Sequence, residues 1–168
     1  MPRPPRIDFP EARHHVMNRG VKRQDIFLDD ECCWVFLDLL GRAVDRYGVR
    51  IHGFALMSNH FHLMAESVRG NLSRFMQFVS ARYSSFLGQY KGWEGPLFTS
   101  RYRNKLVLAD EHWMYLLAYL HLNPVRARIV MRADQSRWTS HRAYAGKGGG
   151  LEWLTTSELS EYFEPEGG

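Results

Sequence analysis

The sequence predicts an α+β fold with strands and helices in the order β-α-β-β-α-β and one more helix after the last strand. Two observations indicate this order: apolar runs of strand length alternate with longer segments of helical periodicity, and turn or capping residues separate them. The chain has 168 residues, of which 45% are hydrophobic and 24% are charged. That size and composition are typical of one globular domain and exclude a disordered chain.

Short polar signals mark the first strand and the first helix. Residues 13–18 have the length of a strand and end at residues 19–20 (Arg-Gly), a turn signal. Residues 29–31 (Asp-Asp-Glu) supply an N-cap and acidic side chains for a first helical turn. Apolar residues at helical spacing predict a helix as far as about Tyr47, and Gly48 is a favourable residue for its end.

A hairpin and a second helix follow. Residues 49–57 are apolar enough for a central strand, residues 58–59 (Ser-Asn) can form a two-residue turn, and residues 60–66 predict the returning strand. The second helix opens at Asn71 or Ser73, where a run of apolar residues at helical spacing begins.

The last strand and the last helix complete the order. After a break at residues 92–96, residues 101–108 predict a fourth strand, and Asp110 caps a further helix. We expect Asn123-Pro124 to end this helix, because the residue before a proline disfavours the helical conformation. The order is that of the ferredoxin-like split βαβ fold, in which an antiparallel sheet carries helices on one face.

Three parts of the chain differ in composition. Residues 1–12 are proline-rich and predict an extended N-terminal arm, residues 13–145 hold the predicted domain, and residues 146–168 predict a glycine-rich link and an acidic tail. The last part has one lysine and five glutamates, a net charge of −4, so the +4 of the whole chain leaves +8 on residues 1–145. Such a field suits an anionic partner, and the tail could fold over the basic face and compete for it.

Other features argue against a membrane protein and a secreted protein. No apolar run approaches the roughly 18–20 residues of a membrane span, and the N-terminal sequence has no apolar region of the secretory kind. The only cysteines, Cys32 and Cys33, are adjacent, which predicts two reduced thiols in a cytoplasmic protein rather than a disulfide or a zinc site.

Three groups of residues could carry chemistry, and each also has an ordinary structural explanation. His60 and His62 lie two apart on a predicted strand, so both imidazoles face one side and could bind a divalent metal, although such a pair is often only polar surface. Tyr115, Tyr119 and Asn123 share one face of the last helix. A tyrosine there could act as a nucleophile and Asn123 as a ligand, or the tyrosines could pack on the sheet while Asn123 caps the helix.

The third group is a basic face of the predicted fourth strand. Arg101, Arg103 and Lys105 alternate along it, Tyr102 lies between them, and Arg126 and Arg128 follow the last helix. Basic residues interleaved with an aromatic one are typical of a surface for single-stranded nucleic acid. A solvated strand edge would show the same pattern.

In combination, these groups resemble the REP-associated tyrosine transposases, which belong to the HUH single-strand transposases with one catalytic tyrosine. The matching stretches are residues 15–20 (HVMNRG), 57–63 (MSNHFHL), 95–98 (GPLF), 101–103 (RYR), 119–127 (YLHLNPVRA) and 138–140 (WTS) with Tyr144. The resemblance covers about residues 13–145. Ser58 stands where the family usually has proline, which alters the turn and not the chemistry.

The resemblance implies a role for each group. It implies that His60 and His62 hold Mg²⁺ or Mn²⁺, with the third ligand on Asn123; His121 is a competitor that would face away from Tyr119 on a regular helix. It implies that Tyr119 is the nucleophile that cleaves and rejoins DNA through a 5′-phosphotyrosine, with Tyr115 as its rival.

The resemblance also implies a substrate, single-stranded DNA folded as a hairpin from a repeated palindrome, and a nucleoid-associated protein that is a monomer or a homodimer. The expected backbone contacts are Arg13, Arg19, Arg101, Arg103, Lys105 and Arg126. Two alternatives remain from the sequence: a catalytically silent protein that binds DNA hairpins, and a metal-dependent hydrolase of small phosphoesters.

Overall fold

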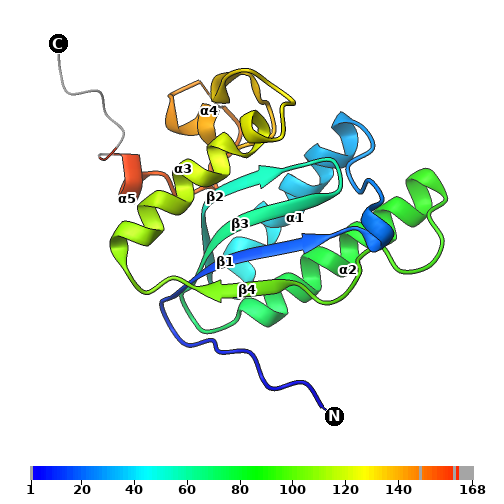
Figure 1. Cartoon of the computed structure of the whole chain (residues 1–168). Coiled ribbons are helices and arrows are strands. Elements are labelled where there is room, and N and C mark those ends of the chain that lie inside the picture. The colour runs from blue at the N-terminus through cyan, green and yellow to red at the C-terminus, as the bar shows by residue number, and fades with distance from the viewer. Residues whose placement is uncertain (1, 148, 161, 163–168) are drawn as a thin grey trace.

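The computed structural model describes residues 2–147, 149–160 and 162, and it is built on a four-stranded antiparallel sheet with the order β2-β3-β1-β4 (Figure 1). The strands are β1 (Ala12–Arg19), β2 (Val49–Leu56), β3 (His60–Ser67) and β4 (Arg103–Leu106). The long helices are α1 (Asp30–Tyr47), α2 (Leu72–Lys91) and α3 (Asp110–Arg126). Four short helical segments complete the described chain: η1 (Val21–Arg23), η2 (Ala133–Gln135), α4 (His141–Tyr144) and α5 (Ser157–Ser160). The order confirms the predicted α+β fold.

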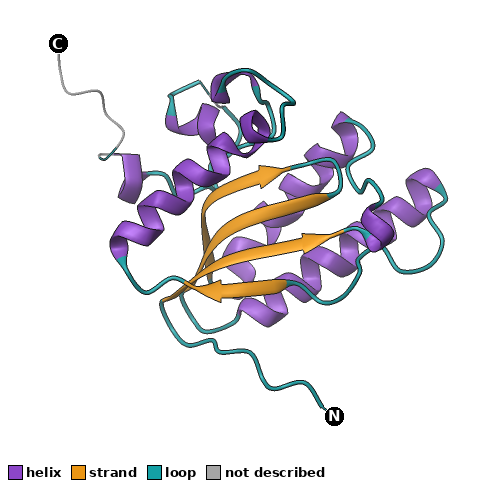
Figure 2. Ribbon diagram, viewed as in Figure 1, coloured by secondary structure: helices purple, strands orange, loops and turns teal. Residues whose placement is uncertain are grey.

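Helices cover the sheet on both faces (Figures 1 and 2). α1 and α2 lie on one face and enclose the larger core, which includes Phe36, Phe61 and Phe75, all of them without solvent exposure. α3 lies on the other face, where Trp113 and Leu117 belong to a second, smaller core. The expected arrangement of helices on one face therefore holds for α1 and α2, and the additional helix covers the opposite face.

Local capping explains where the first helix begins and ends. The side chain of Asp29 accepts a hydrogen bond from the backbone N–H of Cys32 at 3.0 Å, which satisfies one of the free donors of the first turn. Gly48 ends the helix with φ 62°, a left-handed conformation that glycine adopts without strain. Both boundaries are those that the sequence predicts.

The N-terminal arm supplies the cap of α2. The side chain of Asn71 makes no capping hydrogen bond; instead Asp8 Oδ2 accepts from the backbone N–H of Leu72 at 3.0 Å. The same carboxylate accepts from Ser67 Oγ at 2.9 Å and lies 3.0 Å from the buried His14 Nε2. One aspartate thus fastens the arm to β1, to β3 and to the start of α2.

Two predicted boundaries were wrong. The fourth strand is shorter than residues 101–108, since only Arg103–Leu106 pair with β1, which leaves Arg101 in the preceding loop. α3 does not end at Asn123-Pro124 but continues to Arg126. Proline removes one helical hydrogen bond, yet this happens only in the last turn, where Pro124 is buried and so contributes packing.

The described part of the C-terminal segment packs along β2. Leu154 forms a parallel bridge with Ile51, and Leu154 and Leu159 are buried. Trp153 lies against Gly41 of α1, where a Cβ atom would come 2.6 Å from the Trp153 ring. β2 and β4 are opposite edges of the sheet, so this segment lies away from the basic residues of β4. Residues 161 and 163–168 of the expected acidic tail lie outside the described residues. The expectation that the tail folds over the basic face is therefore not tested for these residues.

Two further expectations concern membrane-spanning helices and the state of the two cysteines. None of the helices among the described residues is long and apolar enough to cross a membrane. Cys32 and Cys33 are buried free thiols, as predicted. Burial raises the pKa of Cys33 to about 12, which keeps this thiol protonated and unreactive.

His121 of α3 gives the fold a dependence on pH. It is 5% exposed and its Nε2 lies 2.8 Å from Ser140 Oγ. Burial, with a smaller effect of His141, lowers the pKa of His121 to about 3. An unfolded histidine titrates near 6.5, so as pH falls below that value the unfolded chain takes up a proton that the folded chain excludes.

We therefore predict that His121→Gln reduces the loss of stability in acid. The free energy of unfolding of the wild type should fall by up to roughly 1.4 kcal/mol per pH unit for this one group between pH 6.5 and the folded pKa. Urea unfolding at about pH 7 and pH 5 measures this, and the variant should lose about 2 kcal/mol less than the wild type. Equal losses in both proteins would contradict the assignment to His121.

Candidate active site between the sheet and α3

The pairing of β1 with β3 brings the predicted histidines together on the face under α3. Arg19 lies opposite His60 and Met17 lies opposite His62. Because side chains alternate along a strand, the two histidines share this face while Phe61 points into the core on the other side. The rings of His60 and His62 are 5.1 Å apart, centre to centre. The same-face prediction for this pair is thus confirmed.

A hydrogen-bond chain fixes which nitrogen of His60 is available. Asn59 Nδ2 donates to the carbonyl of Arg23 at 3.2 Å, which turns Asn59 Oδ1 toward His60 Nδ1 at 2.7 Å. A carbonyl oxygen only accepts, so His60 carries its proton on Nδ1 and keeps a lone pair on Nε2. Burial, and then the charge of Arg19, lowers the pKa of His60 and favours this neutral form.

His62 is held by a third histidine. It is 3% exposed, and its Nδ1 lies 2.9 Å from His15 Nε2 of β1. Burial, followed by the charges of His15, His60 and Arg19, lowers the pKa of His62 to about 3. If His62 donates from Nδ1 to His15, its own Nε2 retains a lone pair, as a metal ligand requires.

His15 is the residue of this cluster to which the sequence alone assigned no role. Its ring stacks on His62 with centres 5.1 Å apart, and burial together with the charge of Lys105 lowers its pKa. The available signal was its place in the HVMNRG stretch, two residues before Met17 and so on the same strand face. Only the pairing of β1 with β3 shows that it meets His62.

α3 brings Tyr119 to this histidine cluster. The centre of its ring lies 5.9 Å from that of His62 and 6.3 Å from that of His15, in edge-on contacts. Its rival Tyr115 is 67% exposed, one turn earlier. His121 faces the opposite side, toward Ser140, as the helical geometry predicts. Asn123 lies one turn after Tyr119 and is half-buried.

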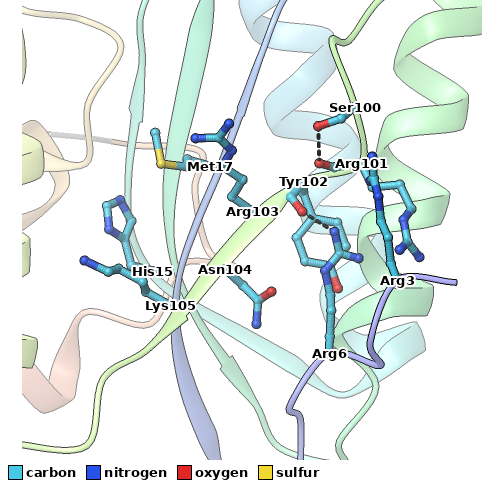
Figure 3. Close-up of a pocket in the computed structure, with 10 residues that line it drawn as sticks. All are labelled: Arg3, Arg6, His15, Met17, Ser100, Arg101, Tyr102, Arg103, Asn104 and Lys105. Atoms are coloured by element: carbon cyan, nitrogen blue, oxygen red, sulfur yellow. Dashed lines mark hydrogen bonds between the residues drawn. The ribbon is translucent and has the colours of Figure 1, made fainter. Parts of the chain in front are cut away.

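A basic cleft borders the histidine cluster (Figure 3). It measures about 680 Å³, and Arg103 and Lys105 of β4 and the loop residue Arg101 line it together with His15. The N-terminal arm adds Arg3 and Arg6, for which the sequence pattern indicates no role. The guanidinium of Arg6 lies 3.8 Å over the ring of Tyr102 and bonds the carbonyl of that residue, which fixes the arm against the cleft.

The other expected DNA contacts occupy different positions. The guanidinium of Arg126 lies 5.2 Å over the ring of Tyr119, and Arg19 lies beside His60. Arg13 is at the far end of β1, opposite Glu66, and forms an ion pair with Asp110 at the start of α3. The structure therefore brings five of the six expected basic residues around the cluster and the cleft, and it does not bring Arg13 there.

A second polar cluster lies at the other end of β3. His52, Glu66 and Glu158 place potential ligand atoms within 4.8 Å of one another, and His52 Nε2 lies 2.7 Å from Glu66 Oε2. Arg50 lies 3.6 Å from Glu66 and 3.5 Å from Glu158. Because Arg50 already balances these carboxylates, we interpret the cluster as a polar contact that holds α5 on the sheet.

Solved structures of other proteins share this fold. A solved structure described as the REP-associated tyrosine transposase bound to a REP hairpin superimposes with a TM-score of 0.72, covers 92% of each chain and is 11% identical. The tRNA(His) guanylyltransferase of Saccharomyces cerevisiae superimposes with a TM-score of 0.51 at 12% identity, over 94% of this chain and 77% of that one. At such identities the likeness concerns the fold, which different activities share.

The sequence shows to which protein family the chain belongs. Residues 9–121 match the family model of the IS200-like transposases, and the chain belongs to that family. No curated protein matches the sequence. The matched residues include β1, the His60 and His62 strand and Tyr119, so the family assignment and the histidine–tyrosine cluster concern the same part of the molecule.

If His60 and His62 hold a divalent metal, as the family resemblance implies, we predict that Asn59→Ala weakens its binding about 10-fold or more, because the substitution removes the acceptor that holds the His60 ring and its proton. Electron paramagnetic resonance of free Mn²⁺ during a titration measures the affinity. Asn104→Ala is the matched control, since Asn104 Nδ2 lies 3.1 Å from a nitrogen of the buried His14, away from His60. Equal affinities for the wild type and Asn59→Ala would exclude this positioning role.

Proposed function

We propose that this transposase cleaves and rejoins single-stranded DNA with Tyr119 as its nucleophile. The observation that carries the proposal is the contact of the Tyr119 ring with His62, in a cluster that also holds His60 and His15. Membership of the IS200-like transposases supports DNA cleavage as the reaction class. The cluster adds the residues that would perform it.

The residues present fit a divalent metal. His60 offers Nε2 because Asn59 engages its Nδ1, and the depressed pKa values of His60 and His62 keep both imidazoles neutral and able to coordinate. His60, His62 and Asn123 would hold Mg²⁺ or Mn²⁺. When bound, the ion would act as a Lewis acid that withdraws charge from a phosphodiester.

The reaction that these residues support is a transesterification. The phenol oxygen of Tyr119 attacks phosphorus, the bond from phosphorus to the 3′-oxygen breaks, and a 5′-phosphotyrosine forms. The phenol proton leaves Tyr119, and the departing 3′-oxygen gains a proton to become a hydroxyl. Since the ester bond is kept in the covalent intermediate, a second 3′-hydroxyl can reverse the step and reseal a strand without an external energy source. The guanidinium of Arg126 lies 5.2 Å over the Tyr119 ring and would meet the charge of the phosphate.

The proposed substrate is DNA folded as a hairpin with single-stranded flanks. The structural neighbour with a TM-score of 0.72 is described as bound to a REP hairpin. In this chain the cleft of about 680 Å³ offers Arg101, Arg103 and Lys105 to the phosphates, and the arm adds Arg3 and Arg6. We propose backbone contacts from these residues and from Arg19 and Arg126.

We predict that Tyr119→Phe abolishes the covalent adduct with DNA and leaves hairpin affinity within a few-fold. Phenylalanine keeps the ring that packs on His62 and removes only the oxygen that would attack. Incubation with labelled hairpin DNA and Mn²⁺, followed by denaturing electrophoresis, measures the adduct. Tyr115→Phe is the control and should retain it.

Two outcomes would oppose this assignment. An adduct that persists in Tyr119→Phe and disappears in Tyr115→Phe would move the nucleophile by one turn of α3. A wild type that binds hairpins without any adduct, and whose affinity does not respond to metal or to His60→Ala, would be a silent hairpin-binding protein.

We further predict different salt dependences for two arginines on the same face of the sheet. Arg103→Ala should weaken hairpin binding and reduce the slope of log affinity against log salt by about one, because a phosphate contact is lost. Arg13→Ala should leave the slope unchanged, because Asp110 already pairs with Arg13. Fluorescence anisotropy at several salt concentrations measures both slopes; equal changes in the two variants would contradict the proposed path of the DNA.

A further inference from the structure

The helical side of the molecule, opposite Tyr119, carries a group of arginines that the proposed chemistry does not use. Arg42 and Arg46 of α1 and Arg82 of α2 place their guanidinium carbons 6.0, 5.3 and 5.2 Å from the ring centre of Phe78. Arg74, one turn before Phe78 on α2, lines a shallow cleft of about 530 Å³ together with Arg46, Phe78 and Arg82. We call these four arginines with Phe78 the arginine surface.

The charge of this surface is largely unbalanced. All four arginines are exposed, and Arg42 has Asp38 at 4.0 Å. Within residues 2–147, 149–160 and 162, no carboxylate lies within 4.0 Å of Arg46, Arg74 or Arg82. The acidic neighbour on α1, Asp45, is exposed.

Three guanidinium groups gather around the Phe78 ring, whose negative face attracts each of them. An anion bound among them would balance their positive charge. Arginine forks match the oxygens of a phosphate, and the amide side chains of Asn71 and Gln77 line the same cleft.

We propose that the arginine surface binds the phosphate backbone of a second nucleic-acid segment, a duplex, while the first segment occupies the face of Tyr119. The proposal rests on the proposed function for the identity of that first segment. The sheet separates the two surfaces, since α1 and α2 lie on one face of it and α3 on the other (Figure 1). A short duplex bound to one surface therefore leaves the other free.

The chemistry of the surface favours phosphates over bases. Phe78 is half-buried and three guanidinium groups lie within 6.0 Å of its ring centre, which disfavours base stacking on this ring. Binding should then be independent of sequence and strongly dependent on salt, as expected for backbone contacts. For an enzyme that joins strands, this surface would hold a second duplex on the same protein molecule as the cleaved strand.

The test uses the full chain and a labelled duplex of random sequence. Wild-type protein mixed with one equivalent of an unlabelled hairpin should bind the duplex in a ternary complex, measured by fluorescence anisotropy. The triple variant Arg46→Glu/Arg74→Glu/Arg82→Glu should bind it at least 10-fold more weakly. The triple lysine variant at the same positions keeps the charge and should stay within a few-fold of the wild type. Circular dichroism checks that each variant is folded.

The outcomes separate this proposal from the proposed function. The glutamate variant should keep its hairpin affinity and its covalent adduct, because the histidine cluster is untouched. If the wild type fails to bind hairpins at all, duplex binding by the free protein still compares the wild type with the glutamate variant. Equal duplex affinity in these two proteins, or equal loss in the lysine and glutamate variants, would overturn the proposal. So would binding of phosphatidylserine vesicles by the wild type without binding of the duplex.

Discussion

The pairing of β1 with β3 is the constraint on which the site depends. These are the two central strands, and their register sets Met17 opposite His62 and Arg19 opposite His60. A shift by one residue would turn the imidazoles into the core and expose Phe61, which the packed core under α1 and α2 resists. The cost of exposing apolar side chains on one face therefore holds the polar cluster on the other.

The position of Tyr119 depends on how closely α3 approaches the sheet. Leu117 packs over Gly53 of β2, where a Cβ atom would come 2.7 Å from Leu117 Cδ1, so a larger residue at this position would displace the Leu117 side chain. Trp113 is buried one turn earlier, and His121 is anchored on the far side by Ser140. These contacts fix the rotation of the helix about its own axis. Tyr119 is left on the side that faces His62.

The sequence correctly predicts those features that depend on interactions within one segment of the chain. The Asp29 cap, the Gly48 end and the shared face of His60 and His62 follow from spacing along one segment. The contact of His15 with His62, the cap that Asp8 gives to α2 and the arginines that the arm adds to the cleft join segments far apart in the chain. The end of α3 was mispredicted for the same reason, because burial of Pro124 by tertiary packing outweighs a local preference.

The cations around the histidine cluster have two consequences that support each other. Arg19 lowers the pKa values of His60 and His62, and Lys105 lowers that of His15, in each case adding to the effect of burial. The three imidazoles can therefore pack together uncharged, and His60 and His62 keep lone pairs that a metal could use. In the proposed function, the same positive charges would attract a phosphodiester to the cleft. A negative residue in place of Arg19 would favour the charged imidazolium form of the histidines and would repel phosphate. The positive charge of Arg19 therefore favours both metal coordination by the histidines and DNA binding.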